Sequence, residues 1–349
     1  MPKLITRFEP RQSTMAEKRT VRGFAVIGAA LAMVVSLSAG LWSTALHAQA
    51  FPTRPVKLIV PFAPGGPTDI MGRVLSQQFS ATLGEQVVVD NRAGAGGTVG
   101  AEAAARSPAD GYTLLLATAS TLAMAPPLYP RLSYSAADFV PVGLFADAPF
   151  MVVVNPSVPA NTLKELIALA KAKPGALSYG SAGVGNILHV SGELFKSMAG
   201  VDMLHVPYKG GAPARADLVA GRIDAMFEMY ATFRADIPSG KVKVLAVASS
   251  KHHPLMPDIP TAAEAGMPGY EASAWFGLVT PKGSPSEAVN RLNAEMQNAL
   301  KSKDVLDLLA KLAFAPRGGS PEDFGRLIDS EVAKWARVIK EAGIKVDSN

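Results

Sequence analysis

The sequence predicts an α/β protein built from two lobes. Short β-rich runs alternate with helical runs after residue 50, and this alternation occurs twice along the chain. The length of 349 residues suits two domains better than one, and the hydrophobic content of 48% allows a large core. Because strands that alternate with helices usually pair in parallel, we expect each lobe to be a parallel sheet covered by helices.

The first half is expected to contain three strands and two helices. Thr68 or Asp69 is the expected N-cap of the first helix. The expected strands cover 56–62, 86–89 and 112–117, and the expected helices cover 68–83 and 98–105.

The second half repeats this pattern and then ends in helices. Its expected strands cover 150–154, 177–179, 203–206, 223–227, 242–248 and 275–279. Its expected helices cover 163–172, 189–199, 212–220, 286–301, 305–313 and 321–342. We therefore assign 51–145 plus 275–349 to the first lobe and 146–274 to the second.

The first 50 residues are typical of a signal peptide. Three basic residues within 18–22 precede an uncharged run over 24–42, and Ala48-Gln49-Ala50 follows. This order predicts export, with cleavage after Ala50. The alternative is an uncleaved membrane anchor, because the apolar run is nearly long enough to span a bilayer. Two start codons stay open, Met1 and Met15.

Charge and cysteine content exclude several kinds of site. The signal peptide holds six Lys or Arg and two acidic residues, so it carries +4 of the net charge of +5. The nearly neutral remainder gives no reason to expect nucleic-acid binding. The chain has no cysteine, and its five histidines lack metal-ligand spacing. We expect neither a metal nor a cofactor.

Two loops stand out as candidate ligand sites. Residues 62–69 and 179–186 are both rich in small residues, and both lead from an expected strand into an expected helix. A helix N-terminus presents unpaired N–H groups and partial positive charge, which suits an anion. The alternative is that the glycines only form turns. Two such loops in equivalent positions of two lobes favour a shared anion site.

The enzyme motifs that these segments resemble are incomplete. Tyr179 stands where a nucleophile elbow around Ser181 requires glycine. The glycine patterns at 94–99 and 183–188 both lack the last glycine of a dinucleotide-binding loop. We therefore expect no enzyme, and an α/β hydrolase that uses Ser181 with His189 or His205 stays the alternative.

Several motifs, in order, resemble the Bug-type substrate-binding proteins of tripartite tricarboxylate transporters. The likeness extends from Phe51 to Asp347. The segments that carry it are Phe51–Val56, Val60–Asp69, Val89–Gly97, Pro108–Leu116, His205–Gly211, Asp258–Gly266 and Trp275–Leu278.

This resemblance implies a type II periplasmic-binding-protein fold with a hinge between the lobes, often called a Venus flytrap. It implies a periplasmic receptor, expected as a monomer, that captures a small carboxylate between its lobes. The carboxylate would dock mainly on backbone N–H groups of the two loops, and the receptor would deliver it to the membrane subunits of the transporter. The alternative partner is a membrane sensor kinase, to which the protein would report ligand occupancy.

The expected ligand-binding residues come from both lobes. They are Phe62, Gly65, Gly66, Pro67, Thr68, Asp69, Ser120, Ser181, Ala182, Gly183, Asn186, His189, Tyr208 and Glu228. Tyr208 and Trp275 could instead be surface or core aromatics.

The chain departs from the family pattern at positions that should shape the ligand. Val184, Ile187, Leu188 and Leu122 stand where polar residues are usual, and Glu228 stands where aspartate is common. Unpaired polar groups of a ligand would lose free energy against such a wall, whereas apolar surface would gain it. We therefore expect a monocarboxylate with an apolar or aromatic body rather than citrate.

The signal-peptide assignment makes a direct prediction. The protein recovered from the periplasm should begin at Phe51, because the Ala48-Gln49-Ala50 segment satisfies the small-residue rule for cleavage. Intact-mass spectrometry checks this. A mature chain that still contains residues 24–42 would contradict it.

Overall fold

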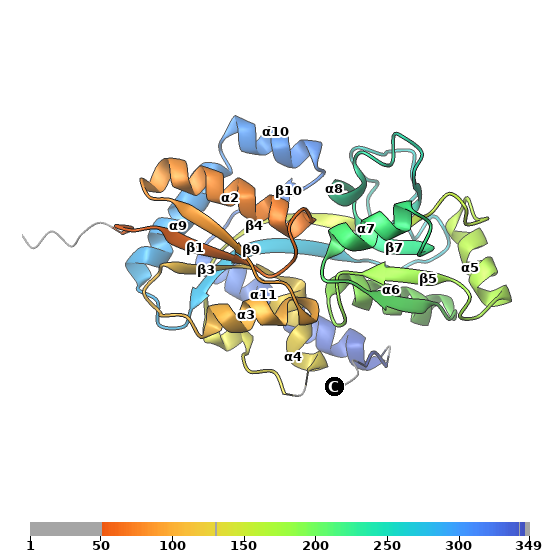
Figure 1. Cartoon of the computed structure of the whole chain (residues 1–349), viewed down its shortest axis with the longest axis horizontal. Coiled ribbons are helices and arrows are strands. Elements are labelled where there is room, and N and C mark those ends of the chain that lie inside the picture. Colours follow the sequence, from red (N-terminus) through yellow and green to blue (C-terminus); the bar gives the residue numbers. More distant parts are fainter. Residues whose placement is uncertain (1–50, 130, 342, 346–349) are drawn as a thin grey trace, which may run out of the picture. The chain divides into compact units, whose positions relative to one another are not determined.

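The computed structural model describes residues 51–129, 131–341 and 343–345 (Figure 1). The expected signal peptide therefore lies outside the described residues. From Phe51 onward the chain forms one compact unit. Within the described ranges, no helix is both long and apolar enough to cross a bilayer.

One set of strands is formed by the two ends of the mature chain. In it, β1 (Val56–Val60) pairs in parallel with β2 (Val87–Asn91) and β3 (Thr113–Thr118). Strand β9 (Ser273–Pro281) then pairs antiparallel with β3 and with the first part of β4 (Phe139–Val154). The short β10 (Ala315–Pro316) also pairs with β4.

A second set is formed by the middle of the chain. The last part of β4 pairs antiparallel with β7 (Ala225–Met229) and with β8 (Lys243–Val247). Strand β5 (Ser178–Ser181) pairs in parallel with β7 and β6 (Leu204–Pro207). Figure 1 shows the two sets side by side, joined by β4.

The expectation of purely parallel sheets is wrong in both halves. Strand β9 returns from the second set to the first, and it therefore enters the first sheet in the reverse direction. Strand β4 has 16 residues, of which the sequence pattern predicted only the last part, 150–154. Pro141, Gly143 and Pro149 hid the rest, because such residues usually end strands. The register of β4 against β9 shifts at Pro141/Gly143, which accommodates these residues.

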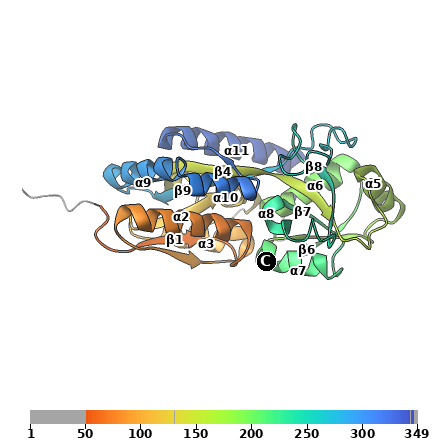
Figure 2. The same cartoon turned by 90° about the horizontal axis from the view of Figure 1, so that it is seen from above.

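The helices lie close to their expected positions. Strand β4 contacts α11, which lies along it (Figure 2). The helices are α2 (Pro67–Leu83), α3 (Thr98–Ala105), α4 (Ala125–Leu128), α5 (Leu163–Ala172), α6 (Ile187–Ala199), α7 (Gly211–Val219), α8 (Tyr230–Phe233), α9 (Ser286–Ala299), α10 (Lys303–Lys311) and α11 (Pro321–Glu341).

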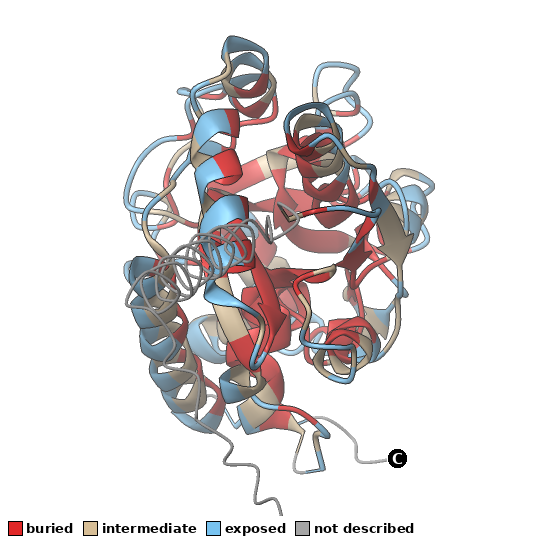
Figure 3. Ribbon diagram, turned by 90° about the vertical axis from the view of Figure 1, so that its left-hand side faces the viewer, coloured by how far each residue is buried: buried red, intermediate tan, exposed pale blue. Residues whose placement is uncertain are grey.

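The strands form the core, and the helices expose only their outer faces (Figure 3). Every residue of β3 and β7 is buried. Trp275 belongs to this core. Its ring packs edge-on against Phe324 of α11 at 5.5 Å, and its Nε1 donates to Glu331 at 3.3 Å. Trp275 is 4% exposed and is thus a core aromatic.

The lobe boundaries at 145/146 and 274/275 stay a prediction. Both positions fall inside strands, β4 and β9, rather than in loops.

Candidate functional site

A pocket lies where loops from the two strand sets meet. The lining residues are Phe62, Gly66, Pro67, Thr68, Thr118, Ala119, Ser120, Ala182, Asn186, Ile187, Leu188, Gly211, Glu228, Met229, Ala274 and Phe276.

Three helices begin at this pocket. Gly66 is the N-cap of α2, Asn186 is the N-cap of α6, and Gly211 is the first residue of α7. The first N–H groups of a helix have no acceptor within it, and they carry partial positive charge. No Lys, Arg or His is among the lining residues that the structure describes. An anion here would therefore be held by backbone N–H groups and hydroxyls.

The first predicted loop is shaped by Asp69. The expectation that Thr68 or Asp69 caps α2 is wrong, because the helix begins one residue earlier with Pro67, whose missing N–H costs nothing there. Asp69 instead accepts hydrogen bonds from the Gly65 N–H (2.9 Å) and the Asn91 amide (3.0 Å), and it pairs with Arg73 (2.8 Å).

These contacts favour the ionised form of Asp69, and they also engage the N–H group of Gly65. Burial alone would raise the pKa of Asp69, but the hydrogen bonds from Arg73, Gly65 and Asn91 lower it below its usual value. The Gly65 N–H is therefore not free for a ligand. Gly65 and Asp69 lie behind the pocket wall, while Gly66 and Thr68 line it.

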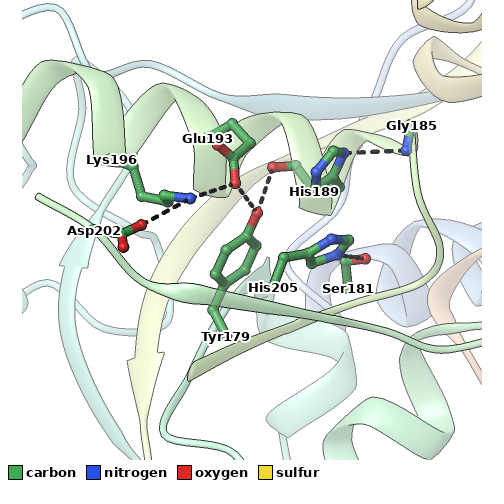
Figure 4. Close-up of polar contacts among 8 residues, drawn as sticks. All are labelled: Tyr179, Ser181, Gly185, His189, Glu193, Lys196, Asp202 and His205. Atoms are coloured by element: carbon green, nitrogen blue, oxygen red, sulfur yellow. Dashed lines mark hydrogen bonds and ion pairs between the residues drawn. The ribbon is translucent and has the colours of Figure 1, made fainter. Parts of the chain in front are cut away.

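The second predicted loop is held by a polar network behind the pocket (Figure 4). Ser181 Oγ accepts from the Gly183 N–H at 3.2 Å and lies 2.6 Å from His205 Nε2. His189 Nδ1 accepts from the Gly185 N–H at 3.1 Å. The N–H groups of Gly183 and Gly185 are thus used within the loop. Contrary to the expectation that Gly183 binds the ligand, its N–H is not free to do so.

A stack of neutral rings supports this loop. The centroids of the His189 and His205 rings are 4.1 Å apart, and the Tyr179 ring also stacks on His205, at 4.9 Å. Burial lowers the pKa of His189 to about 4 and that of His205 to about 3, so both are uncharged at neutral pH. The Tyr179 hydroxyl donates to Glu193 at 2.6 Å, which anchors the stack to α6.

The Ser181–His205 pair has the spacing of a nucleophile and its base. However, Ser181 is completely buried and is absent from the pocket lining. Its Oγ also donates to the Gly183 carbonyl at 3.1 Å. Among the described residues, no acidic side chain hydrogen-bonds the other nitrogen of His205. These contacts favour a structural role.

Direct contacts join the two strand sets beside the pocket. Ser120 Oγ, after β3, accepts from the Ile187 N–H of α6 at 2.8 Å. The Tyr129 hydroxyl donates to the Val184 carbonyl at 2.6 Å. Gly96 packs so closely on Val184 and Gly185 that a side chain there would overlap with them.

The structure separates the predicted site residues into three groups. Gly65, Asp69, Ser181 and His189 support the wall from behind, and Gly183 and Tyr208 line a second pocket beside Lys209. The predicted residues that line the main pocket are Phe62, Gly66, Pro67, Thr68, Ser120, Ala182, Asn186 and Glu228.

The expected apolar wall is only half correct. Ile187 and Leu188 line the pocket, whereas Val184 lines the second pocket. Leu122 has no exposed surface and lies in the hydrophobic core, because the chain continues from β3 into a buried π-helical turn. Phe276 and Met229 supply the missing apolar surface.

Sequence reasoning also missed two polar features. Gly211 opens a third helix N-terminus, which the Gly210-Gly211 pair before an expected helix could have indicated. Thr118 lines the pocket at the end of β3 and is 4% exposed, yet its Oγ1 has no hydrogen-bond partner in the described structure. A buried polar atom without a partner is uncommon and is often completed by a ligand or water.

Glu228 is the titratable residue of the pocket lining. It is 1% exposed, and its Oε1 accepts from the Met229 N–H at 2.8 Å. Burial raises the pKa of Glu228 to about 8, although the hydrogen bond from the Met229 N–H acts in the opposite direction. The side chain is therefore mostly protonated at neutral pH. In the described residues, no group of three or more His, Asp or Glu is placed to hold a metal ion.

Two strand sets that share the long strand β4, with helix N-termini facing one pocket between them, define a periplasmic binding protein of the Venus-flytrap type. The chain belongs to the receptor family of the tripartite tricarboxylate transporters. The sequence profile described as "Tripartite tricarboxylate transporter family receptor" matches residues 71–344. The predicted family and fold class are thereby confirmed.

Curated relatives agree with this assignment. The chain is 42% identical over 316 residues to the "UPF0065 protein in tcbD-tcbE intergenic region" of Pseudomonas sp. (strain P51), which covers 90% of this chain and 92% of the relative. It is 39% identical over 327 residues to "Protein BugT" of Bordetella pertussis, covering 93% and 98%.

Solved structures of similar proteins include two with carboxylates. An R. palustris protein with adipate is 38% identical, with a TM-score of 0.82, covering 84% of this chain and 99% of its own. MatC from Rhodopseudomonas palustris with bound malate is 34% identical, with a TM-score of 0.80, covering 83% and 100%. The periplasmic binding protein BugD is 38% identical, with a TM-score of 0.82, covering 84% and 99%.

The buried Glu228 predicts how stability depends on pH. The folded state keeps a proton that the unfolded state, in which this glutamate has its ordinary pKa of 4.5, releases. The free energy of unfolding should therefore fall as pH rises from 4.5 to 8, by about 2–3 kcal/mol between pH 5 and pH 7. Glu228→Gln should remove this fall.

Denaturant unfolding of the unchanged protein and of Glu228→Gln, each at pH 5 and pH 7, measures this change in the free energy of unfolding. Glu271→Gln, an exposed carboxyl, is the matched control and should behave as the unchanged protein. The same pH dependence in Glu228→Gln would contradict a protonated Glu228.

Proposed function

We propose that this chain is a periplasmic receptor that binds one small carboxylate in the main pocket and delivers it to the membrane subunits of a tripartite tricarboxylate transporter. The observation that carries this proposal is the convergence of three helix N-termini on a pocket without basic side chains. Such a site neutralises an anion through backbone N–H groups. The relatives with adipate and with malate support the ligand class.

The carboxylate would accept hydrogen bonds from N–H and hydroxyl groups that bond no other protein atom in the described structure. The N–H groups of Gly66 and Thr68 lie at the start of α2, before its intrahelical hydrogen bonds begin. The Thr118 hydroxyl lacks a partner in the described structure. At α6, the Ile187 and His189 N–H groups are already bonded, which leaves that of Leu188.

The walls favour an apolar ligand body. Phe62, Ile187, Leu188, Met229 and Phe276 surround the pocket. Burying apolar surface against them stabilises the complex by about 25 cal/mol per Å². Hydroxyl groups in the same place would lose water without gaining partners. We therefore retain an acid with an apolar body as the preferred ligand.

Closure of two lobes, 51–145 plus 275–349 and 146–274, is part of the proposal. Ser120 and Tyr129 in one lobe would bond Ile187 and Val184 in the other when the pocket closes. Because these contacts form only between lobes, they would stabilise the closed state together with the ligand. Export with removal of residues 1–50 completes the proposed role, and no catalysis is part of it.

Thr118 gives a sharp test of the proposed pocket. Thr118→Val keeps the shape but removes the hydroxyl, so it should not lower the unfolding temperature, because Oγ1 bonds no other atom in the described structure. Affinity for the probe acids hexanoate and benzoate should fall about 3- to 10-fold, the effect of one lost hydrogen bond. Isothermal titration calorimetry measures the affinity.

Ser191→Ala is the matched control, because the Ser191 hydroxyl is equally buried and unpartnered but lies outside the pocket lining. Its affinities should equal those of the unchanged protein. Equal losses of affinity in both variants, or no loss of affinity in Thr118→Val, would argue against this pocket as the ligand-binding site.

The absence of catalysis is tested at Ser181. A fluorophosphonate, which labels activated serines, should leave the folded protein unmodified, because the Ser181 side chain is fully buried. Mass spectrometry after incubation measures labelling. Stoichiometric labelling that disappears in His205→Ala would instead support a hydrolase.

A further inference from the structure

The carboxyl group of Glu228 lies against the start of helix α7. The clearest sign is at Gly211, the first residue of that helix, where a Cβ would be only 2.7 Å from Glu228 Oε2. Glycine at this position therefore makes room for the carboxyl oxygen. Because Oε1 is held by the Met229 N–H, the second oxygen is fixed beside the helix end.

This location is one of the three places in the pocket that suit an anion. A helix N-terminus attracts a carboxyl oxygen through its free N–H groups. At α7 the protein's own Glu228 carboxyl group lies against the first residue of the helix. The ends of α2 and α6 remain open to a ligand, since their residues line the pocket without a carboxyl group beside them.

Among the described residues that line the pocket, no positive side chain would offset the charge of a ligand carboxylate placed near Glu228. Its antiparallel partner on β4 is Met151, and none of the other lining residues is charged. On the helices that reach the pocket, Arg73 of α2 pairs with Asp69, and Arg215 of α7 pairs with Asp236. Both arginines are thus engaged with carboxylates of their own.

We propose that Glu228 determines which acids the pocket accepts. Its carboxyl group occupies the α7 end, so the receptor binds acids with one carboxylate and rejects those that carry a second carboxylate at the far end. This inference rests on the proposed carboxylate function. It adds the residue that sets the ligand class.

Protonation of Glu228 fits this role. With a pKa raised by burial to about 8, the side chain is neutral at pH 7 and adds no repulsion to a monocarboxylate. Above that pH it becomes ionised, and a buried negative charge then opposes any anionic ligand. Affinity for monocarboxylates should therefore be constant between about pH 6 and pH 7, where the ligand is fully ionised, and fall above pH 8.

Hexanoate and adipate test the inference, because they share a six-carbon chain and differ in one carboxylate. Titration calorimetry at pH 7 should show hexanoate binding at least tenfold more tightly than adipate. Glu228→Ala vacates the α7 end and should shift this ratio at least tenfold toward adipate. Glu271→Gln, an exposed carboxyl outside the pocket, should leave the ratio unchanged.

The pH series provides a second, independent readout if Glu228→Ala does not fold. Hexanoate affinity should fall above pH 8 in the unchanged protein and stay constant in Glu228→Gln, which keeps the size of the side chain. Equal binding of hexanoate and adipate, or the same pH profile in both proteins, would overturn the role of Glu228. Binding of neither acid would count against the carboxylate function itself.

Discussion

The pairing of β4 is the constraint on which the rest of the molecule depends. This one strand pairs with β9 over its first part and with β7 and β8 over its last part. The pocket lies at the change of partner. Ala274 of β9 is paired with Ala148, while Met229 and Glu228 of β7 are paired with Phe150 and Met151. Backbone hydrogen bonds thus fix three lining residues relative to one another.

The chemistry of the pocket follows from what this arrangement brings together. Strand ends and helix starts meet there, so the available polar groups are backbone N–H groups and short side chains. Charged side chains stay outside, except for one carboxyl that burial keeps protonated. Recognition by fixed dipoles costs little reorganisation, because the polar network behind each loop already holds the backbone.

The sequence predicted the α/β class, nearly all helices, and two of the three helix starts at the pocket. Strand direction could not be predicted, because a buried run such as β9 looks the same in either orientation. The first part of β4 was missed because prolines and a glycine interrupt it. Leu122 was misplaced because local pattern does not show whether a loop residue faces the core or the ligand.

The contact between Gly96 and Gly185 has a consequence for natural variation. Both glycines have positive φ angles, 66° and 76°, and each lacks room for a methyl group, against Val184 and Tyr129 respectively. A substitution at Gly96 would push this residue away from Val184, and one at Gly185 would push the loop away from Tyr129, while every pocket residue stayed intact. Such natural variants would lose ligand binding although every residue that lines the pocket is unchanged. A comparison of the lining residues alone would wrongly class these variants as functional.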